Sequence, residues 1–294
     1  MMFDVDYLDI VITRSCQLNC QGCLTFSNHN KVKGHIDSVT AVPWLMAWSH
    51  RIRPKQIHLF GGEPLMHPAF FPWVRNVYNT FCKNRVGSVI HVQTNGLKLS
   101  SLSDSDLKIL IFRFNVKFNI SMHSDESWYL DTVNPQIERL AKCLGGEWTH
   151  DGLVSICDKD GYYVKVTHQT KMPWVPHYQG HGSTLRPGRA WDDEHYVKSH
   201  SYCEAKGFIQ LVNGSLYKCP PMGVLSDTLK TYDYPNKPDW QEWLDYQSVS
   251  HDCSDSELEA WLTLQSQPER YCNMCFGPNA HEVKLHQLKI KQHE

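Results

Sequence analysis

Short runs of β-branched and aromatic residues recur along the first two-thirds of the chain, and longer segments with helical spacing separate them. Such runs predict strands, which we expect at residues 8–13, 56–60, 89–94, 116–122 and 162–167. The helical spacing predicts helices at about residues 39–51, 68–84, 103–111 and 135–144. Strands separated by helices indicate right-handed βαβ units, and these units predict a parallel sheet.

The pattern changes in the last third of the chain. From residue 172 to residue 191 Pro, Gly and His replace the periodic pattern, which predicts a linker or a substrate-side loop with room for a sixth strand. The following stretch GFIQLVNGSLYKC predicts two strands joined at Asn213-Gly214, a dipeptide that favours a tight hairpin turn. We therefore expect two domains, at residues 1–190 and 191–294.

Composition and charge restrict the classes of function. The chain has 294 residues, of which 41% are hydrophobic, so it can bury a large core. Its 29 basic and 31 acidic residues are interspersed and give a net charge of -2, which argues against nucleic-acid and membrane-surface binding. The acidic start MMFDVDYLDIVIT is unlike a signal peptide, and no apolar run approaches about 20 residues. We expect a cytoplasmic protein.

Eleven cysteines are the most informative feature of the composition. An odd count, a long chain and short C-x2-C spacings argue against a disulfide framework. Cys16, Cys20 and Cys23 follow the first predicted strand directly, at the edge of a parallel sheet where ligands bind. Three thiolates can hold three irons of a cubane cluster and leave the fourth iron open to another ligand. A zinc site would usually take four protein ligands.

A second group of cysteines lies near the C-terminus. The turn at residues 213–214 would bring Cys203 and Cys219 to the two sides of one hairpin, and the C-x2-C pair Cys272 and Cys275 would complete a four-thiolate site. Two alternatives stay open from the residues alone. Cys253 could replace one of the four ligands, and the group could bind zinc instead of an iron–sulfur cluster.

The first triplet and three further motifs resemble the radical S-adenosylmethionine (SAM) superfamily. Gly61-Gly62-Glu63-Pro64 after the second strand matches its GGEP motif, in which the glycine backbone lets SAM approach and the carboxylate can meet its ammonium group. Thr94-Asn95-Gly96 ends the third strand, and Ser121 lies late in the fourth. Gly22 stands where many members have an aromatic residue beside the adenine. The resemblance implies SAM contacts from Gly22, Gly61, Gly62, Glu63, Pro64, Thr94, Asn95 and Ser121.

The resemblance extends to the C-terminal cysteines, which look like the twitch form of the SPASM/twitch extension. Full SPASM domains have further cysteines after the C-x2-C pair, whereas residues 276–294 contain none. The implied ligands of one auxiliary [4Fe-4S] cluster are Cys203, Cys219, Cys272 and Cys275. The expected fold is a partial (β/α)6 radical SAM barrel, of the α/β class, with a small C-terminal extension of a twitch-like β-hairpin plus helix.

Such a protein would be an oxidoreductase-type enzyme with two [4Fe-4S] clusters. An external reductant of the flavodoxin or ferredoxin type would drive cleavage of SAM to a 5'-deoxyadenosyl radical, which would abstract a hydrogen atom from a small molecule. The auxiliary cluster would then accept an electron and complete a net oxidation. The alternatives are a maturase of a ribosomally made peptide and a non-catalytic, zinc-stabilised binding protein. No residue is assigned as the general base.

Overall fold

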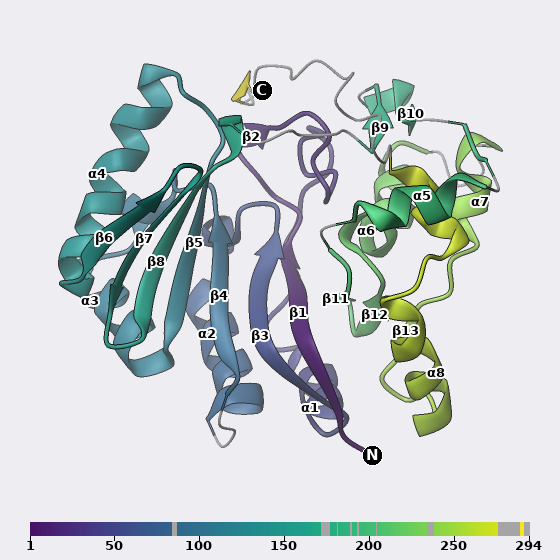
Figure 1. Ribbon diagram of the computed structural model, residues 1–294, viewed down its shortest axis with the longest axis horizontal. Helices are drawn as coiled ribbons and strands as arrows, with labels where there is room; N and C mark the ends of the chain where they lie inside the picture. Colours follow the sequence, from purple (N-terminus) through teal and green to yellow (C-terminus); the bar gives the residue numbers. More distant parts are fainter. Residues whose placement is uncertain are drawn as a thin grey trace.

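The computed structural model describes residues 1–83, 87–171, 177–180, 182–188, 190–192, 194–203, 205–233, 238–275 and 289–290 (Figure 1). Ten strands of the described residues form the main sheet. They are β1 (Phe3–Thr13), β3 (Ile52–Gly61), β4 (Val89–Thr94), β5 (Val116–Met122), β6 (Glu147–Asp151), β7 (Val154–Lys159), β8 (Tyr162–His168), β11 (Phe208–Val212), β12 (Ser215–Tyr217) and β13 (Val249–Ser250). Their order is β13-β12-β11-β1-β3-β4-β5-β8-β7-β6.

From β11 to β8, each neighbouring pair of strands is parallel. The carboxyl ends of these strands therefore lie at one edge of the sheet. The α/β fold with a parallel sheet is confirmed, and β4 and β5 have the predicted bounds. β1 and β3 begin earlier than predicted, at Phe3 and Ile52, because their first residues already pair with each other.

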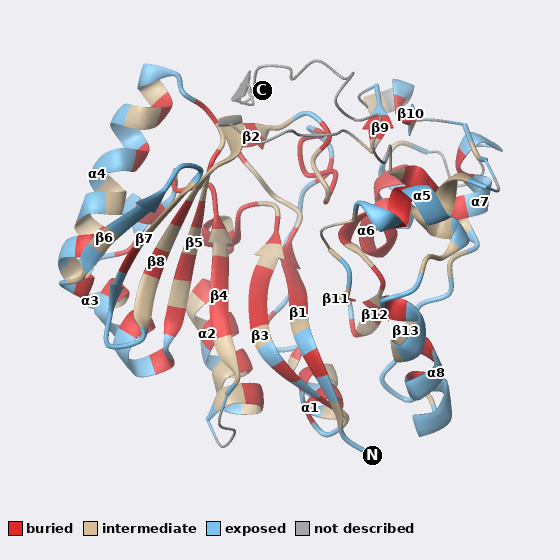
Figure 2. Cartoon of the chain, in the orientation of Figure 1, coloured by how far each residue is buried: buried red, intermediate tan, exposed pale blue. Residues whose placement is uncertain are grey.

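Four helices follow the strands of the first half and cover one face of the sheet (Figure 1). They are α1 (Val42–Ser49), α2 (Phe70–Val77), α3 (Asp104–Lys108) and α4 (Ser127–Leu144). Alternate residues of β1, such as Leu8 and Ile10, pack against Trp48 of α1 and Trp73 of α2 in the larger hydrophobic core. Figure 2 shows this burial concentrated in the central strands.

Helix α4 is longer than the sequence predicts. Pro135 is typical of a first helical turn, so the prediction began there, but the helix starts at Ser127 and contains Pro135 in its interior. Tyr129 and Val133, which precede the proline, are fully buried and hold this first part against the sheet. Gly145 ends the helix in a left-handed conformation with φ 67°.

The sequence analysis missed the hairpin of β6 and β7. These strands pair with each other and add to β8 in an antiparallel sense, at the end of the sheet. β6 is largely exposed, so it has no buried face and no alternating pattern that sequence inspection could detect. Its position is decided by pairing with β7.

The predicted C-terminal hairpin is confirmed as β11 and β12, whose register places Val212 opposite Ser215. Asn213 and Gly214 both have positive φ, 48° and 87°, as a two-residue hairpin turn requires. β11 also pairs in parallel with β1, so the main sheet continues across the expected domain boundary at residue 190. The division into residues 1–190 and 191–294 stays a prediction.

Four helices follow in the C-terminal part: α5 (His195–Ser201), α6 (Pro220–Thr231), α7 (Gln241–Leu244) and α8 (Asp255–Gln265). Side chains of α6 and α7 form a second hydrophobic core that includes Met222, Leu225 and Trp243. Phe26 and Tyr178 belong to this core and stack at 4.5 Å between ring centroids. The second core therefore joins the C-terminal helices to the loop that carries the first cysteines.

The region in which a sixth strand was expected, residues 172–191, lies partly outside the described residues. Its described part contains β9 (Tyr178–Gln179) and β10 (Arg186–Pro187), which form a separate antiparallel pair. Another small pair joins β2 (Leu18–Asn19) to β14 (Lys289–Ile290). No helix within the described ranges is both long enough and apolar enough to span a membrane.

Candidate functional site

The first three cysteines lie on residues 14–34, a segment that follows β1 and that we call the cysteine loop. Cys16, Cys20 and Cys23 are half-buried. Burial raises the pKa of Tyr129, and the thiols of Cys20 and Cys16 add to the rise. Burial likewise raises the pKa of Tyr178, with additions from Cys23 and Cys20. Since such effects weaken with distance, the fold brings the three thiols into one neighbourhood.

The segment that begins at Gly61 crosses the start of the cysteine loop. The Gly62 N–H donates to the Thr13 carbonyl and the Glu63 N–H donates to the Ser15 carbonyl, both at 2.8 Å. A Cβ atom at Gly61 would lie 2.1 Å from the Thr13 oxygen, and one at Gly62 would lie 2.1 Å from the Ser15 oxygen. Both glycines are therefore required for close backbone contact. This contact fixes the direction in which the loop leaves β1.

Glu63 joins the ends of two strands. Its buried carboxylate accepts hydrogen bonds from Leu65 N at 3.0 Å, Thr94 Oγ1 at 2.8 Å and Asn95 N at 2.8 Å. Burial raises the pKa of Glu63 to about 7, although these donors favour the charged form. Pro64 begins a short 3-10 helix at Pro64–Met66, and Glu63 caps it. Glu63 thus holds the segment after β3 against the end of β4.

Asn95 continues this network to the first cysteine. Its side-chain oxygen accepts from Gln17 Nε2 at 3.1 Å, and its Nδ2 donates to Cys16 Sγ at 3.8 Å. The buried Tyr129 hydroxyl donates to the Asn95 carbonyl at 2.6 Å and lies 3.1 Å from the Ser121 carbonyl. The motifs predicted after the second, third and fourth strands are therefore hydrogen-bonded together beside the cysteine loop.

Gly22 has a local explanation. It is buried and has φ 67°, in the left-handed region that glycine adopts without cost. An aromatic residue at this position would be strained. The departure from the superfamily pattern at Gly22 therefore follows from the backbone of the loop.

Arg14 connects the cysteine loop to α6. Its Nη2 donates to the Thr25 carbonyl at 3.0 Å and to Thr228 Oγ1 of α6 at 2.7 Å. Burial lowers the pKa of Arg14 to about 10, against the opposing influence of Asp227 and Cys23. The guanidinium is therefore protonated at neutral pH. Thr25 itself donates from Oγ1 to the Gly61 carbonyl at 2.9 Å, which ties the loop to the glycine segment.

The four cysteines predicted to form the second group do lie close together. Burial raises the pKa of Cys219 to about 12, and the thiols of Cys272 and Cys203 add to the rise. Burial also raises the pKa of Cys275, with further contributions from Cys219, Cys203 and Cys272. Burial raises the pKa of Cys272 as well, with a contribution from Cys203. Every one of the four is therefore near the other three, although they come from three separate segments of the chain.

Lys218 stabilises this arrangement. Its side chain is 7% exposed, and its ammonium group donates to the carbonyls of Leu264, Gln265 and Gln267 at 2.8, 3.1 and 2.9 Å. It also forms an ion pair with Glu269 Oε1 at 2.6 Å. Lys218 precedes Cys219 in sequence, whereas these acceptors precede the C-x2-C pair. The lysine therefore holds the hairpin against the end of α8 and the segment after it.

The remaining four cysteines have contacts of other kinds, and the alternative that Cys253 replaces one ligand of the second group stays a prediction. Cys253 Sγ accepts a hydrogen bond from Arg51 Nη1 at 3.2 Å, next to the start of α8. Cys157 is fully buried, and Cys82 and Cys143 pack half-buried against the larger core, as expected for apolar thiols. All eleven cysteines lie within the described residues, and none forms a disulfide.

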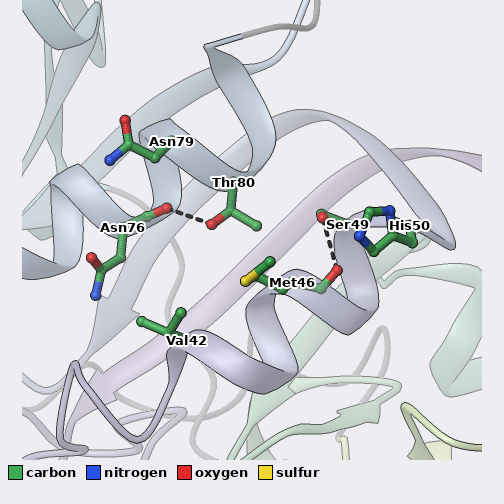
Figure 3. A pocket seen from close by; sticks show the side chains of 7 residues that line it. All are labelled: Val42, Met46, Ser49, His50, Asn76, Asn79 and Thr80. Carbon is green, nitrogen blue, oxygen red and sulfur yellow. Dashed lines mark hydrogen bonds between the residues drawn. The ribbon is translucent and has the colours of Figure 1, made fainter.

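Two further observations concern possible ligand sites. Within the described residues, no group of three or more His, Cys, Asp or Glu side chains is arranged to hold a single metal ion. A hollow of about 480 Å³ lies between α1 and the α2 region (Figure 3). Its Thr80 and Ser49 hydroxyls donate to carbonyls of their own helices, Asn76 and Met46, at 2.7 and 2.8 Å. Neither hydroxyl hydrogen is therefore directed to a ligand. The hollow is lined by Val42, Met46, Ser49, His50, Asn76, Asn79 and Thr80.

Comparisons with known proteins agree with this geometry. Residues 9–128 match a family described as a 4Fe-4S single cluster domain. The chain is 27% identical over 143 residues to a probable GTP 3',8-cyclase of Methanococcus aeolicus, a match that covers 49% of this chain and 42% of the relative. It is 27% identical over 154 residues to a GTP 3',8-cyclase of Clostridium perfringens, with coverage of 48% and 43%. The match thus spans less than half the length of these curated relatives.

The fold comparison covers nearly the whole chain. The crystal structure of BtrN in complex with AdoMet and 2-DOIA matches with a TM-score of 0.50 at 13% identity, over 96% of this chain and 97% of that one. This likeness shows the fold of the chain along almost its whole length. The motifs that resemble the radical SAM superfamily lie together at the carboxyl edge of the sheet, and the C-terminal segment continues the fold beyond residues 9–128, which match the 4Fe-4S family.

Three residues that support the cysteine loop carry little signal in the sequence. Arg14 and Gln17 are single polar residues in a loop, and Tyr129 is one of thirteen tyrosines, so no spacing distinguished them. Their contacts join segments that are far apart in sequence. The only signal in the sequence for Gln17 is its position directly after Cys16.

Proposed function

We propose that this chain is a radical SAM enzyme that holds a [4Fe-4S] cluster with Cys16, Cys20 and Cys23 and binds SAM beside it. The observation that carries the proposal is the cysteine triplet, held at the carboxyl edge of a parallel sheet by the crossing glycine segment. When bound, the cluster and SAM supply one-electron reduction and hydrogen-atom abstraction. An external reductant of the flavodoxin or ferredoxin type would provide the electron.

The donor set fits such a cluster. Besides the three sulfur ligands, the site provides hydrogen-bond donors that can stabilise a thiolate. Leu18 N of the cysteine loop donates to Cys16 Sγ at 3.4 Å, and Asn95 Nδ2, which follows β4, donates to the same atom at 3.8 Å. Hydrogen bonds to cluster sulfurs are one of the ways in which proteins adjust these centres.

The proposed SAM contacts are the backbone and side chains around this loop: Gly22, Gly61, Gly62, Glu63, Pro64, Thr94, Asn95 and Ser121. Both carboxylate oxygens of Glu63 already accept hydrogen bonds from Leu65, Thr94 and Asn95. Glu63 therefore acts first as a positioning residue, which fixes Thr94 and Asn95 relative to the glycines. Any contact with the SAM ammonium adds to that role.

We further propose one auxiliary [4Fe-4S] cluster at Cys203, Cys219, Cys272 and Cys275. Four mutually close thiols fit a cluster whose irons take one thiolate each. A zinc ion would also take four thiolates, and the resemblance of this segment to the twitch extension favours the cluster over zinc. A cluster with four protein ligands has no open iron, so its role would be to accept an electron from the substrate, which makes the reaction a net oxidation.

The inner face of the sheet, opposite the helices, supports a polar small molecule as substrate. His58 Nδ1 lies 2.7 Å from Asp9 Oδ1, and Gln210 Nε2 donates to Asp9 Oδ2 at 2.6 Å. On the neighbouring strands β4 and β5, Asn119 Nδ2 lies 3.2 Å from His91 Nδ1. Asp9, His58, His91 and Gln210 are at most 6% exposed. Buried polar groups cost stability, so their concentration on one face favours a binding role.

Anaerobic reconstitution followed by iron and sulfide analysis tests the proposal. We expect about eight irons per chain and deoxyadenosine production after reduction with SAM. Cys16→Ala should lose about four irons and all deoxyadenosine production. Cys272→Ala should also lose about four irons but should keep SAM cleavage better than substrate turnover. Cys143→Ala is the matched control and should keep both activities.

Absence of iron from the wild-type protein, or absence of SAM cleavage by the iron-loaded protein, would eliminate the enzyme proposal. Zinc bound at the C-terminal cysteines would eliminate only the auxiliary cluster. Equal loss of SAM cleavage and substrate turnover in Cys272→Ala would contradict the electron-acceptor role.

A further inference from the structure

Arg14 is a half-buried cation that forms no ion pair among the described residues. Its Nη2 has two neutral acceptors, the Thr25 carbonyl and the Thr228 hydroxyl, and its Nε is buried with no hydrogen-bond partner. Among the described residues no carboxylate forms an ion pair with Arg14. Asp227 of α6 is near enough to raise the pKa of Arg14, but its side chain is exposed and its Oδ1 lies 3.8 Å from Lys230 Nζ. Burying an unbalanced charge is costly, so a compensating negative charge is expected nearby.

The cysteine loop provides the place for that charge. Arg14 Nη2 donates to the Thr25 carbonyl at 3.0 Å, and Thr25 Oγ1 lies 3.3 Å from Cys23 Sγ, so a single residue connects the guanidinium to the third cysteine. A [4Fe-4S] cluster with thiolate ligands is negatively charged, and its reduction adds one more negative charge. A cation at this distance stabilises the reduced cluster more than the oxidised one, and the reduction potential rises.

We infer that Arg14 is a positioning residue that raises the reduction potential of the cluster held by Cys16, Cys20 and Cys23, and that Thr228 of α6 keeps its guanidinium in place. This inference rests on the proposed function. It adds a residue that lies outside the superfamily motifs, and it assigns the C-terminal extension a role at the first cluster.

Helix α6 makes the anchor rigid. It begins directly after Cys219, and Thr228 lies nine residues after that cysteine, or about 13 Å along a helix. Most of α6 is buried, with Val224, Leu225 and Leu229 in the second core. Thr228 Oγ1 also donates to the Val224 carbonyl at 2.8 Å, which orients its oxygen. The same helix therefore starts at the auxiliary cysteines and ends beside the cation of the first cluster.

Three variants separate charge from anchoring. Arg14→Met removes the charge and keeps most of the side-chain volume. Arg14→Lys keeps the charge but loses the fork that reaches two acceptors. Thr228→Val removes the hydroxyl that accepts the hydrogen bond from Arg14, and valine has nearly the same shape as threonine. Arg14 itself is unchanged in this variant.

The measurement is a redox titration of the anaerobically reconstituted full chain, followed by electron paramagnetic resonance and accompanied by iron analysis. The signal that changes when SAM is added identifies the first cluster, and the other cluster signal is the internal reference. We expect a more negative midpoint potential in Arg14→Met, and smaller shifts in the same direction in Arg14→Lys and Thr228→Val.

An Arg14→Met protein with full iron content and an unchanged midpoint potential would overturn the inference. If Arg14→Met does not assemble its clusters, Thr228→Val decides, and an unchanged midpoint in that variant overturns the inference equally. A wild-type protein without any SAM-responsive cluster signal would instead refute the proposed function, so the two failures are distinguishable.

Discussion

Replacing Lys218 with methionine tests how the second cysteine group is held together. The substitution keeps the aliphatic part of the side chain and removes the ammonium group. Three carbonyls at the end of α8 and the carboxylate of Glu269 then lose a charged donor in a region where Lys218 is 7% exposed and Glu269 is 18% exposed. Water cannot replace the donor without local unfolding, so the loss should be large.

Removing one partner of a buried ion pair costs roughly 3–5 kcal/mol. For a chain of this length a loss of 1 kcal/mol lowers the melting temperature by about 2 °C, so Lys218→Met should lower it by roughly 6–10 °C. Lys55→Met is the matched control. Lys55 pairs with Asp6, but the two side chains are 71% and 63% exposed, and exposed pairs contribute only about 0–1 kcal/mol.

The assay is thermal unfolding of the cluster-free protein by calorimetry, followed by iron analysis after anaerobic reconstitution. We expect Lys218→Met to lose about four irons, because Cys272 and Cys275 are no longer held against Cys219. The first cluster should still form, since Lys218 contacts none of its ligands. If Lys218→Met has the same melting temperature as Lys55→Met and takes up the full amount of iron, Lys218 does not organise this site.

Three further predictions concern the first site and the ligand assignment. Gly62→Ala should prevent assembly of the first cluster, because its Cβ would lie 2.1 Å from a backbone oxygen. In the control Gly152→Ala the new Cβ meets nothing within 4 Å, so the free energy of unfolding should fall by only about 1–2 kcal/mol, owing to the positive φ. Iron analysis of both variants checks this prediction. The pKa of Glu63 is about 7 in the folded protein against an ordinary 4.5, so between these values the folded state binds more protons and stability falls as pH rises. Relative to Glu63→Gln, the wild type should lose about 3 kcal/mol from pH 4.5 to 7, and a pH-independent difference in denaturant unfolding would contradict the burial argument. Cys253→Ser should keep all the iron that Cys203→Ser loses, because Cys253 lies against an arginine; loss of auxiliary iron in Cys253→Ser would reverse the assignment.

The central strands and the C-terminal hairpin were largely predictable. β4 and β5 have the predicted bounds because each is a short run rich in β-branched and aromatic residues, and in β5 the buried residues alternate with partly exposed ones. The hairpin turn was predictable because Asn213 and Gly214 are residues that tolerate positive φ. By contrast, β6 was missed because it is largely exposed, and the first part of α4 was missed because Pro135 indicated a helix start.

The sequence by itself determined which atoms could bind iron, since thiol spacing and placement after a strand are local properties that survive in the unfolded chain. Only the tertiary structure decided what surrounds them. Pairing of β11 with β1 brings the C-terminal hairpin to the main sheet, and Arg14, Glu63 and Lys218 obtain their partners from segments that are distant in sequence. The physical reason is that a buried charge acquires its role from the groups that folding places around it, and a single sequence does not encode that neighbourhood as a pattern.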